Sequence, residues 1–319
     1  MAYDPTKIRI ATTTSVVDSG LMEVINTAFQ AWQSAKNAPT VYHLDWENPN
    51  YLSLGSGAAM DAARNGLADI VISHDRIGEL LFLAECFALV RNHLFFNYFS
   101  LVGPADTTIA YPTTLLLGFQ AIASLPYVSR GAAGRSGTWI REQQILNEFS
   151  ITLNNILPPP VPTPPEVYPG MMATLSYTAD LVGVGTKAYT LTDIGTWYQF
   201  QQENAGRLVM LTSPNDYLNP PCDPPRDPLA SNQYVGMLVN PGAKFLTPLE
   251  QPINTDGAHA FLAWMHTSSG DNNARDAVNT YRVNINTDPQ GTPILKQGFI
   301  YNACSEHFPD DISILKPVV

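Results

Sequence analysis

The N-terminal part of the chain alternates between strand-like and helix-like hydrophobic patterns, and this alternation constrains the fold more than any other feature. Residues 7–11 alternate polar and apolar side chains, as a half-buried strand does, and apolar residues recur at helical spacing over residues 21–32. A second helical pattern over residues 56–63 ends at Gly66, and the apolar run 68–72 that follows is typical of a buried strand. Strands that alternate with helices predict the α/β class, with mostly parallel sheets flanked by helices.

Two longer apolar runs predict strands that join two lobes. A chain of 319 residues exceeds what one hydrophobic core of ordinary size organises, so two lobes are expected. Residues 94–102 and 234–239 each end in a turn, and we expect them to pair as long strands that cross between the lobes. The first lobe is then expected to comprise residues 1–102 and 231–319, and the second residues 103–230.

The charge of the chain excludes two classes of partner. Asp and Glu number 28 against 17 Lys and Arg, which gives a formal net charge of −11. Nucleic acids and anionic membranes are bound by basic patches, and the sequence has no cluster of five or more Lys and Arg residues. If the chain binds an anion, the donors must be local: backbone N–H groups, hydroxyls and one or two arginines.

Membrane insertion is not expected either. No segment approaches the ~20 consecutive apolar residues that span a bilayer. The sequence shows no signal peptide, which fits either a cytoplasmic protein or a mature chain whose leader has been removed. Sequence alone does not choose between these compartments.

Cysteine and histidine spacing predicts neither a metal site nor a cofactor. Cys86, Cys222 and Cys304 lie far apart without a C-x-x-C spacing, and the six histidines form no H-x-x-x-H pair. Cys86 lies in an apolar segment and is expected to be a buried small hydrophobe, whereas Cys222 and Cys304 can pair in an oxidising compartment. His74 and Asp75 can mimic a His–carboxylate pair, but no nucleophile motif accompanies them.

Two proline-rich stretches, residues 157–169 and 214–228, interrupt the pattern. Proline fixes φ and lacks the N–H group, so these stretches are expected to be loops or surface insertions. A docking ligand in the polyproline II conformation is the alternative for residues 158–162. The last long helix is expected to begin at a cap at Asp256 and to pack an apolar stripe into the core.

The first candidate site is a run of four hydroxyl residues, which we name the hydroxyl turn (residues 12–15). It leaves the strand 7–11 and leads into a helix, so that O–H and N–H donors surround one spot, as suits an anion. We take Thr13, Thr14 and Ser15 as candidate ligands. The alternative is a solvated Thr-rich strand end, because hydroxyl clusters are common in turns.

The second candidate site is the arginine loop (residues 129–138), which precedes a helix with Glu142 near its start. Glycines let the backbone approach a ligand closely, and a guanidinium can bind an oxyanion through two charge-assisted hydrogen bonds. The alternative is a flexible loop with solvated arginines, or Arg135 paired with a surface carboxylate. The candidate ligands here are Ser129, Arg130, Arg135, Ser136, Gly137 and Thr138.

Ser56 is a further candidate. We expect it to cap the helical segment 56–63, and the N-terminus of that helix should lie near the hydroxyl turn if both follow neighbouring strands of one sheet. Its alternative role is that of a helix cap without a ligand.

Six ordered blocks carry a resemblance to a known family. They are Ala-Thr-Thr-Thr-Ser at 11–15 with Ser-Gly-Leu at 19–21; Ala-Arg-Asn-Gly-Leu-Ala-Asp-Ile at 63–70 with His-Asp at 74–75; Val-Ser-Arg-Gly at 128–131; Ala-Tyr-Thr-Leu-Thr-Asp-Ile-Gly-Thr at 188–196; Asn-Gln-Tyr at 232–234 with Val-Asn-Pro at 239–241; and Phe-Leu-Ala-Trp at 261–264 with Tyr-Arg-Val-Asn at 281–284. Together they resemble the tungstate-binding component of bacterial tungstate ABC transporters, a branch of the periplasmic binding protein superfamily. The resemblance covers most of the chain outside the proline-rich stretches.

The resemblance implies a two-lobed fold with an oxyanion such as tungstate or molybdate held in the cleft between the lobes. It implies the hydroxyl turn as a ligand loop, Arg130 as the charged partner, an ABC transporter permease as a protein partner and an extracytoplasmic location. The family loop usually reads Ser-Arg-Gly-Asp-x-Ser-Gly-Thr, whereas residues 132–135 here are Ala-Ala-Gly-Arg. The longer, more basic loop suits tighter anion binding, a larger anionic ligand or loss of the ancestral role.

The sequence therefore predicts a non-catalytic solute-binding protein that closes on a small oxyanion. One alternative is an enzyme on the same fold that acts on a phosphorylated or pyrimidine-like substrate, with His74 as acid–base. The other is an interaction protein that kept the scaffold and lost the ligand.

Overall fold

The computed structural model describes residues 3–47, 55–109, 114–131, 135–157, 170–212, 229–266, 273–280, 283–287, 293–296 and 300–301. The chain divides into two compact units. Unit 1 comprises Met1–Phe96, Gln233–Tyr281 and Phe299–Val319, and unit 2 comprises Asn97–Asn232 and Arg282–Gly298. The lobe boundaries expected from the sequence, after residues 102 and 230, stay a prediction.

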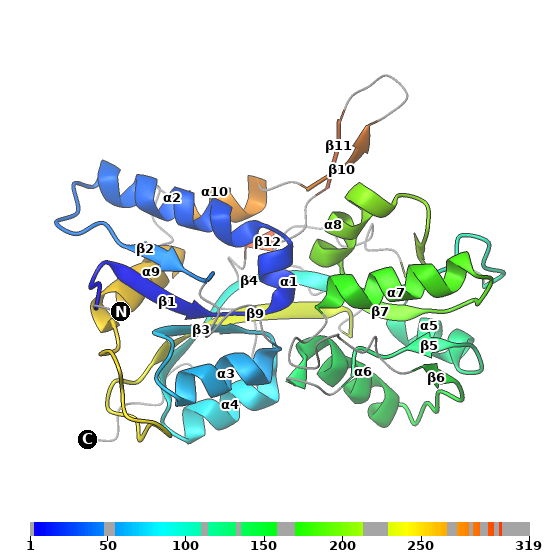
Figure 1. Ribbon diagram of the computed structural model, residues 1–319, viewed down its shortest axis with the longest axis horizontal. Coiled ribbons are helices and arrows are strands. Elements are labelled where there is room, and N and C mark those ends of the chain that lie inside the picture. The colour runs from blue at the N-terminus through cyan, green and yellow to red at the C-terminus, as the bar shows by residue number, and fades with distance from the viewer. Residues whose placement is uncertain are drawn as a thin grey trace. The chain divides into compact units, whose positions relative to one another are not determined.

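The sheet of unit 1 is built around the strand β1 (Lys7–Ala11). β1 pairs in parallel with β2 (His43–Asp45) on one side and with β3 (Ile70–Ser73) on the other (Figure 1). β3 pairs antiparallel with β9 (Ser231–Val239), which lies beside β4 (Ala88–Gly103). The predicted α/β class is confirmed, and the sheet is mixed because β9 runs against β3.

The strands β4 and β9 each contain residues of both units. Within unit 1, β4 also pairs antiparallel with β12 (Ile300–Tyr301). Within unit 2, the C-terminal part of β4 pairs antiparallel with β7 (Thr190–Asp193) and β8 (Val209–Met210).

The rest of unit 2 forms a second, smaller set of strands with helices around it. β5 (Tyr127–Val128) pairs in parallel with β6 (Ile156–Leu157) and forms a parallel bridge to Tyr189. The apolar residues of two helices pack with Val102 of β4 into one buried cluster. The described helices of unit 2 are α5 (Leu115–Ile122), α6 (Gly137–Glu148), α7 (Met171–Gly183) and α8 (Ile194–Asn204). The cluster is formed by α7 and α8. Unit 2 also contains an antiparallel hairpin of β10 (Val283–Thr287) and β11 (Pro293–Lys296).

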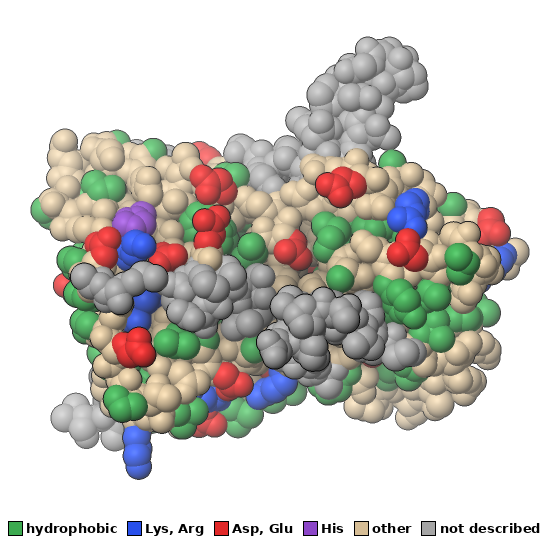
Figure 2. All heavy atoms as spheres, in the orientation of Figure 1, with side chains coloured by type: hydrophobic (Ala, Val, Ile, Leu, Met, Phe, Trp, Pro, Cys, Tyr) green, Lys and Arg blue, Asp and Glu red, His purple; other side chains and the backbone are tan. Residues whose placement is uncertain are grey.

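Charged side chains on the surface are scattered. Figure 2 shows, among the described residues of one face, Lys and Arg side chains that lie singly or beside acidic ones. Arg64 is ion-paired with Asp61 and Glu85, and Arg207 with Asp180. Such exposed pairs add only about 0–1 kcal/mol of stability each, but they neutralise arginines that could otherwise attract a polyanion.

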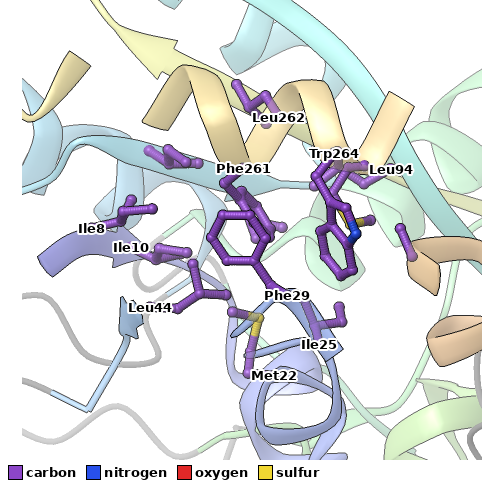
Figure 3. Close-up of a cluster of buried hydrophobic side chains, with 14 of the residues drawn as sticks. Ile8, Ile10, Met22, Ile25, Phe29, Leu44, Leu94, Phe261, Leu262 and Trp264 are labelled. Atoms are coloured by element: carbon purple, nitrogen blue, oxygen red, sulfur yellow. The ribbon is translucent and has the colours of Figure 1, made fainter. Parts of the chain in front are cut away.

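The core of unit 1 follows from the alternation of side chains along its strands. Ile8 and Ile10 of β1 and Ile70 and Ile72 of β3 face one side of the sheet and join one buried cluster. Figure 3 shows Phe29 with Ile8 and Ile10 in this cluster. Ala11 and Val71 face the other side and join a second cluster. The first side is covered by α2 (Leu21–Ala35), α9 (Thr255–His266) and α10 (Asn273–Thr280), and the second by α3 (Ser56–Arg64) and α4 (Arg76–Ala84) (Figure 1). Each large apolar side chain buried in this way contributes roughly 1.5–3 kcal/mol.

A buried ion pair fixes β1 to β3. The Arg9 Nη2 atom lies 2.6 Å from Asp69 Oδ1, and both side chains are buried. Asp69 also accepts the backbone N–H groups of Arg9, at 2.7 Å, and of Asn254, at 2.8 Å. The carboxylate thus joins the first strand to the start of α9.

The predicted end of α3 is confirmed. Gly66 has φ 73°, its N–H bonds to the Ala63 carbonyl at 2.9 Å, and the Leu67 N–H bonds to the Ala62 carbonyl at 3.0 Å. This is the Schellman pattern, in which the left-handed residue is normally glycine.

Two predicted helix starts need correction. α9 is capped by Asn254, whose Oδ1 accepts the Gly257 N–H at 3.0 Å, whereas Asp256 lies in the first turn. For α3 the N-cap is Gly55, and Ser56 is the first helical residue without a side-chain cap bond. In both cases the helix begins one or two residues away from the residue that the sequence pattern favoured, as is common at helix ends.

The expectation for Cys86 is wrong. It is exposed and has φ 62°, because it occupies the left-handed position that ends α4. The Cys86 N–H bonds to the Leu83 carbonyl, the Phe87 N–H bonds to the Phe82 carbonyl, and the two phenyl rings stack 5.6 Å apart. Phe82 and Phe87 take the buried positions of this Schellman motif, which turns the intervening cysteine outward.

Some sequence expectations fall outside the described residues. These are the Cys222–Cys304 pairing, the polyproline segment 158–162 and both proline-rich stretches, except for Leu157, which belongs to β6.

Candidate functional site

The hydroxyl turn lies between β1 and the short helix α1 (Thr14–Asp18). Thr13 is the N-cap residue of α1, and its carbonyl accepts the N–H groups of Val16 at 3.1 Å and Val17 at 3.2 Å. The side chains of Thr12, Thr13 and Ser15 are at most 3% exposed. The alternative of a solvated strand end is therefore wrong for these three residues.

A chain of hydrogen bonds links the turn to another strand. Thr13 Oγ1 lies 3.2 Å from Ser15 Oγ, which lies 3.0 Å from the hydroxyl of Tyr234. Tyr234 belongs to β9 and is fully buried. The sheet explains the meeting, because β1 ends beside β3 and β3 runs antiparallel to β9, with Ser73 opposite Val235.

Ser56 reaches the same edge of the unit 1 sheet. Its Oγ accepts the backbone N–H of His74 at 3.3 Å, and the His74 ring stacks on the Tyr234 ring with a centroid distance of 4.8 Å. Asp75 accepts the Gly78 N–H at 3.0 Å as the cap of α4. The carboxylate that sequence reasoning set beside His74 therefore has a structural role.

One hydroxyl proton in the turn, and a second when Ser15 donates to Thr13, is not accounted for by the described part of the chain. Thr12 Oγ1 is buried and has no hydrogen-bond partner there. Thr13 Oγ1 bonds only to Ser15 Oγ, so when Ser15 donates, the Thr13 proton has no acceptor there either. Buried polar groups nearly always have partners, so such a pair marks a place where a further acceptor fits.

The arginine loop in unit 2 follows β5 and leads into α6. Ser129 and Arg130 are buried, with 7% and 3% exposure, and Gly131 has φ 78°, a left-handed value that favours glycine. Ser136 is the N-cap of α6, and its carbonyl accepts the Ile140 N–H at 3.0 Å. Arg135, by contrast, is exposed.

Glu142 anchors this loop from the second turn of α6. Its carboxylate accepts the Ser129 hydroxyl at 2.8 Å and the Tyr127 hydroxyl at 2.7 Å, and Gln143 Nε2 lies 3.2 Å away. Ser129 Oγ in turn accepts the Gly131 N–H at 3.2 Å. One carboxylate thus ties the end of β5, the start of the loop and α6 together.

Burial dominates the electrostatics of this anchor. Desolvation raises the pKa of Glu142 above its ordinary value, although the hydrogen bonds from Tyr127, Ser129 and Gln143 act in the opposite direction. Desolvation also raises the pKa of Tyr127 well above its ordinary value, and the Glu142 carboxylate adds to that rise. Ser129 gives its only hydroxyl proton to Glu142, so this proton is not offered to a ligand.

The structure groups the predicted residues by unit. Thr13, Thr14, Ser15 and Ser56 gather at one edge of the unit 1 sheet, where Thr14 is partly exposed. Ser129, Arg130, Ser136, Gly137 and Thr138 are buried around the loop and helix start of unit 2, and Arg135 is the exposed member. Their contact with a ligand stays a prediction.

Sequence reasoning missed two residues that hold these groups in place. Tyr234 stands in one of the ordered blocks, but only the strand order shows that it meets Ser15, 219 residues away. Glu142 was noted as a residue near a helix start. It lies 13 residues from Ser129 in the sequence, and no motif predicts the hydrogen bond between them. A tyrosine in an apolar strand and a carboxylate on a buried helix face are the only hints available.

The described residues hold no group of three or more His, Cys, Asp or Glu side chains arranged to bind a metal ion. Among them, no helix combines the length and the apolar character needed to cross a membrane.

Comparisons with known proteins agree with this architecture. Residues 4–269 match the family described as PBP superfamily domain. The chain is 30% identical over 252 residues to a candidate ABC transporter anion-binding protein of Haloferax volcanii. The aligned residues cover 74% of this chain and 66% of that relative, slightly less than two thirds of its length. It is 26% identical over 264 residues to the tungstate-binding protein TupA of Peptoclostridium acidaminophilum, which covers 81% of this chain and 77% of that relative.

Solved structures show the same fold. The tungstate-binding protein TupA of Desulfovibrio alaskensis matches with a TM-score of 0.59 and 22% identity, over 93% of this chain and 99% of that one. A tungstate ABC transporter protein of Geobacter sulfurreducens matches with a TM-score of 0.61 and 22% identity, over 88% and 100%. The predicted PBP-like fold is thereby confirmed. Because the family match spans most of its length, this chain belongs to the PBP superfamily.

Proposed function

We propose that this chain is a non-catalytic binding protein that captures a small tetrahedral oxyanion of the tungstate or molybdate type. The observation that carries the proposal is the hydroxyl turn, where the Thr12 hydroxyl is buried without a partner in the described part of the chain and Thr13 and Ser15 share one hydrogen bond. An oxyanion is an acceptor of the right size and chemistry for these donors. The names of the two curated relatives, one anion-binding and one tungstate-binding, support the same ligand class.

Charge on the ligand is proposed to be met by Arg130 from the arginine loop. A buried guanidinium can give two parallel, charge-assisted hydrogen bonds, each worth about 1.5–3 kcal/mol. In the proposal one anion takes donors from the hydroxyl turn and from Arg130 together, in a cleft between the lobes. Bonds completed only on closure would then favour a closed state, because a ligand shifts an equilibrium by its difference in affinity for the two states.

The net charge of −11 makes this a locally built site. The field of the whole chain repels a dianion, so attraction must come from a few oriented donors at short range. Higher ionic strength is then expected to speed capture of the anion by screening the repulsion, while the short hydrogen bonds are screened less.

We further propose that the protein works outside the cytoplasm and delivers its anion to an ABC transporter permease. The support is the transport role printed in the names of the relatives. Because the chain covers about two thirds of the Haloferax relative, these whole-protein properties are part of the proposal.

The test is anion binding by the purified protein after bound ligand is removed by unfolding, dialysis and refolding. Titration calorimetry and thermal melting with tungstate, molybdate, sulfate and phosphate should show binding and a raised melting temperature for at least one of them. Native mass spectrometry with elemental analysis of the protein as first purified should identify the anion that it carries. An unchanged melting temperature and no heat with all four anions would contradict the proposal.

A further inference from the structure

The hydrogen bonds of the hydroxyl turn allow their protons to be counted. Three hydroxyl groups stand in a row, those of Tyr234, Ser15 and Thr13, and two short contacts join them. Each hydroxyl has one proton to donate, so two contacts use two of the three protons. The third proton belongs to an end of the row that does not donate inward or, when both ends donate inward, to Ser15.

Acidity decides the direction of the row. A phenol has a pKa near 10 and is a far better donor than an aliphatic hydroxyl, and its oxygen is the weaker acceptor. The favoured arrangement therefore has Tyr234 donating to Ser15, and the second contact then uses the proton of either Ser15 or Thr13. The unused proton then belongs to Ser15 or Thr13, inside the turn where the Thr12 hydroxyl also has no partner among the described residues.

We propose that Tyr234 is a positioning residue for anion binding: by donating to Ser15 it leaves the Ser15–Thr13 pair with one hydroxyl proton to present to the anion. This inference rests on the proposed function and adds a residue to it. Hydrogen bonds in a buried row polarise one another, so the phenol also strengthens the final donor. With the row reversed, Thr13 would present a lone pair to the anion and repel it.

The position of Tyr234 separates its hydroxyl from its ring. The ring is buried, stacks on His74 and packs against Phe95 at 5.2 Å. Tyr234→Phe keeps these contacts and removes only the hydroxyl. A loss of affinity in this variant is therefore a loss of proton orientation rather than of packing.

The first experiment measures the dissociation constant of molybdate by calorimetry. Tyr234→Phe is expected to weaken binding by about threefold to tenfold, the range of one neutral hydrogen bond. Tyr189→Phe is the matched control, because Tyr189 is equally buried and its hydroxyl lies 3.0 Å from that of Thr107, away from the hydroxyl turn. The control is expected to change the affinity less than about twofold, and equal losses in both variants would overturn the proposal.

A double-mutant cycle tests whether Tyr234 acts through Ser15. In the Ser15→Ala background the row is interrupted, so adding Tyr234→Phe is expected to change the affinity by less than about twofold. Additive losses from the two substitutions would overturn the proposed route. Melting temperatures of the anion-free variants show whether any change in affinity follows a change in folding.

The direction of the row can be measured without any anion. The Raman doublet of tyrosine reports whether the phenol is mainly donor or acceptor, and the difference between wild type and Tyr234→Phe isolates this residue. A donor signature supports the row, and an acceptor signature overturns it even if the protein binds molybdate. If the wild type binds no oxyanion, the proposed function fails, while the spectrum still decides the direction.

Discussion

The hydroxyl turn and the arginine loop hold their donors with anchors of opposite polarity. In unit 1 the anchor is Tyr234, whose hydroxyl lies 3.0 Å from that of Ser15 and, in the proposed row, donates to it. In unit 2 the anchor is Glu142, a carboxylate that takes a proton from Ser129. Two serines that look alike in the sequence, Ser15 and Ser129, are thereby given opposite tasks.

The difference identifies the donors that each region has left for a ligand. In the proposed row the turn keeps a hydroxyl proton for the ligand, so neutral O–H groups are its contribution. The loop sends the Ser129 proton inward, so its contribution must come from the Arg130 guanidinium and from backbone N–H groups at the start of α6. A neutral hydroxyl is cheap to bury when it is bonded, whereas a charged donor in a buried loop needs a rigid support.

The largest expected effect comes from removing the charge of the loop. Arg130→Ala should weaken oxyanion binding by roughly 10-fold to 100-fold, because one or two charge-assisted hydrogen bonds are lost. Arg130→Lys should recover only part of this loss, since an ammonium keeps the charge but not the planar fork. Calorimetric titration of both variants with the anion that the wild type binds best measures the difference.

Arg135→Ala is the matched control within the same loop. Arg135 is exposed whereas Arg130 is 3% exposed, and a solvated arginine loses little when it is truncated. Its affinity should stay within about twofold of the wild type. Similar losses at both positions would mean that the loop attracts the anion by general charge and not by one oriented guanidinium.

The sequence predicts the secondary structure of these regions better than it predicts the hydrogen bonds of their side chains. Periodicity and turn residues identified β1, β3, α2 and α3 correctly, because alternation and helical spacing are local properties of the chain. The hydroxyl turn could be proposed for the same reason, since its four residues are consecutive. What could not be read is which way each hydroxyl points.

The orientation of the hydroxyls depends on partners that are remote in sequence or unmarked by any motif. Tyr234 meets Ser15 only because β9 runs antiparallel beside β3, a choice that strand patterns do not encode. Cys86 was misjudged for a related reason. Its apolar neighbours suggested burial, but α4 ends at Ala84, and Cys86 takes the left-handed position after the C-cap residue Glu85, where its side chain is exposed.

A second, intermediate effect concerns the anchor of the loop. Because burial raises the pKa of Glu142 in the folded chain above its value in the unfolded chain, the folded state holds the proton more tightly between these two values. The stability contributed by this group is complete below the unfolded value and is lost as the pH rises through the folded one. Glu142→Gln removes that loss, so the melting temperature of the variant minus that of the wild type should become more positive as the pH rises above about 4.

Glu148→Gln serves as the control, because Glu148 ends the same helix and is exposed. Its difference in melting temperature from the wild type should not change with pH. If the Glu142→Gln difference is equally flat, the carboxylate is not the buried, titrating anchor that distinguishes the arginine loop from the hydroxyl turn. Calorimetric melts of both variants at four or five pH values, without added anion, make the comparison.

The smallest expected effect comes from removing the Thr12 hydroxyl of the hydroxyl turn. Thr12 Oγ1 is buried without a partner among the described residues, so Thr12→Val, which keeps the shape of the side chain, should raise the free energy of unfolding of the anion-free protein by about 1 kcal/mol. Thr178→Val is the contrast, because the Thr178 hydroxyl donates to the Thr174 carbonyl at 2.8 Å and its loss should not stabilise the chain.

If Thr12 supplies a proton to the anion, the same Thr12→Val variant should bind the anion about threefold more weakly. Chemical denaturation with and without anion separates the two quantities. A variant that gains stability and loses affinity would show that the hydroxyl is kept for the ligand at the expense of the fold, whereas a loss of stability like that of Thr178→Val would mean that Thr12 already has a partner in the folded chain.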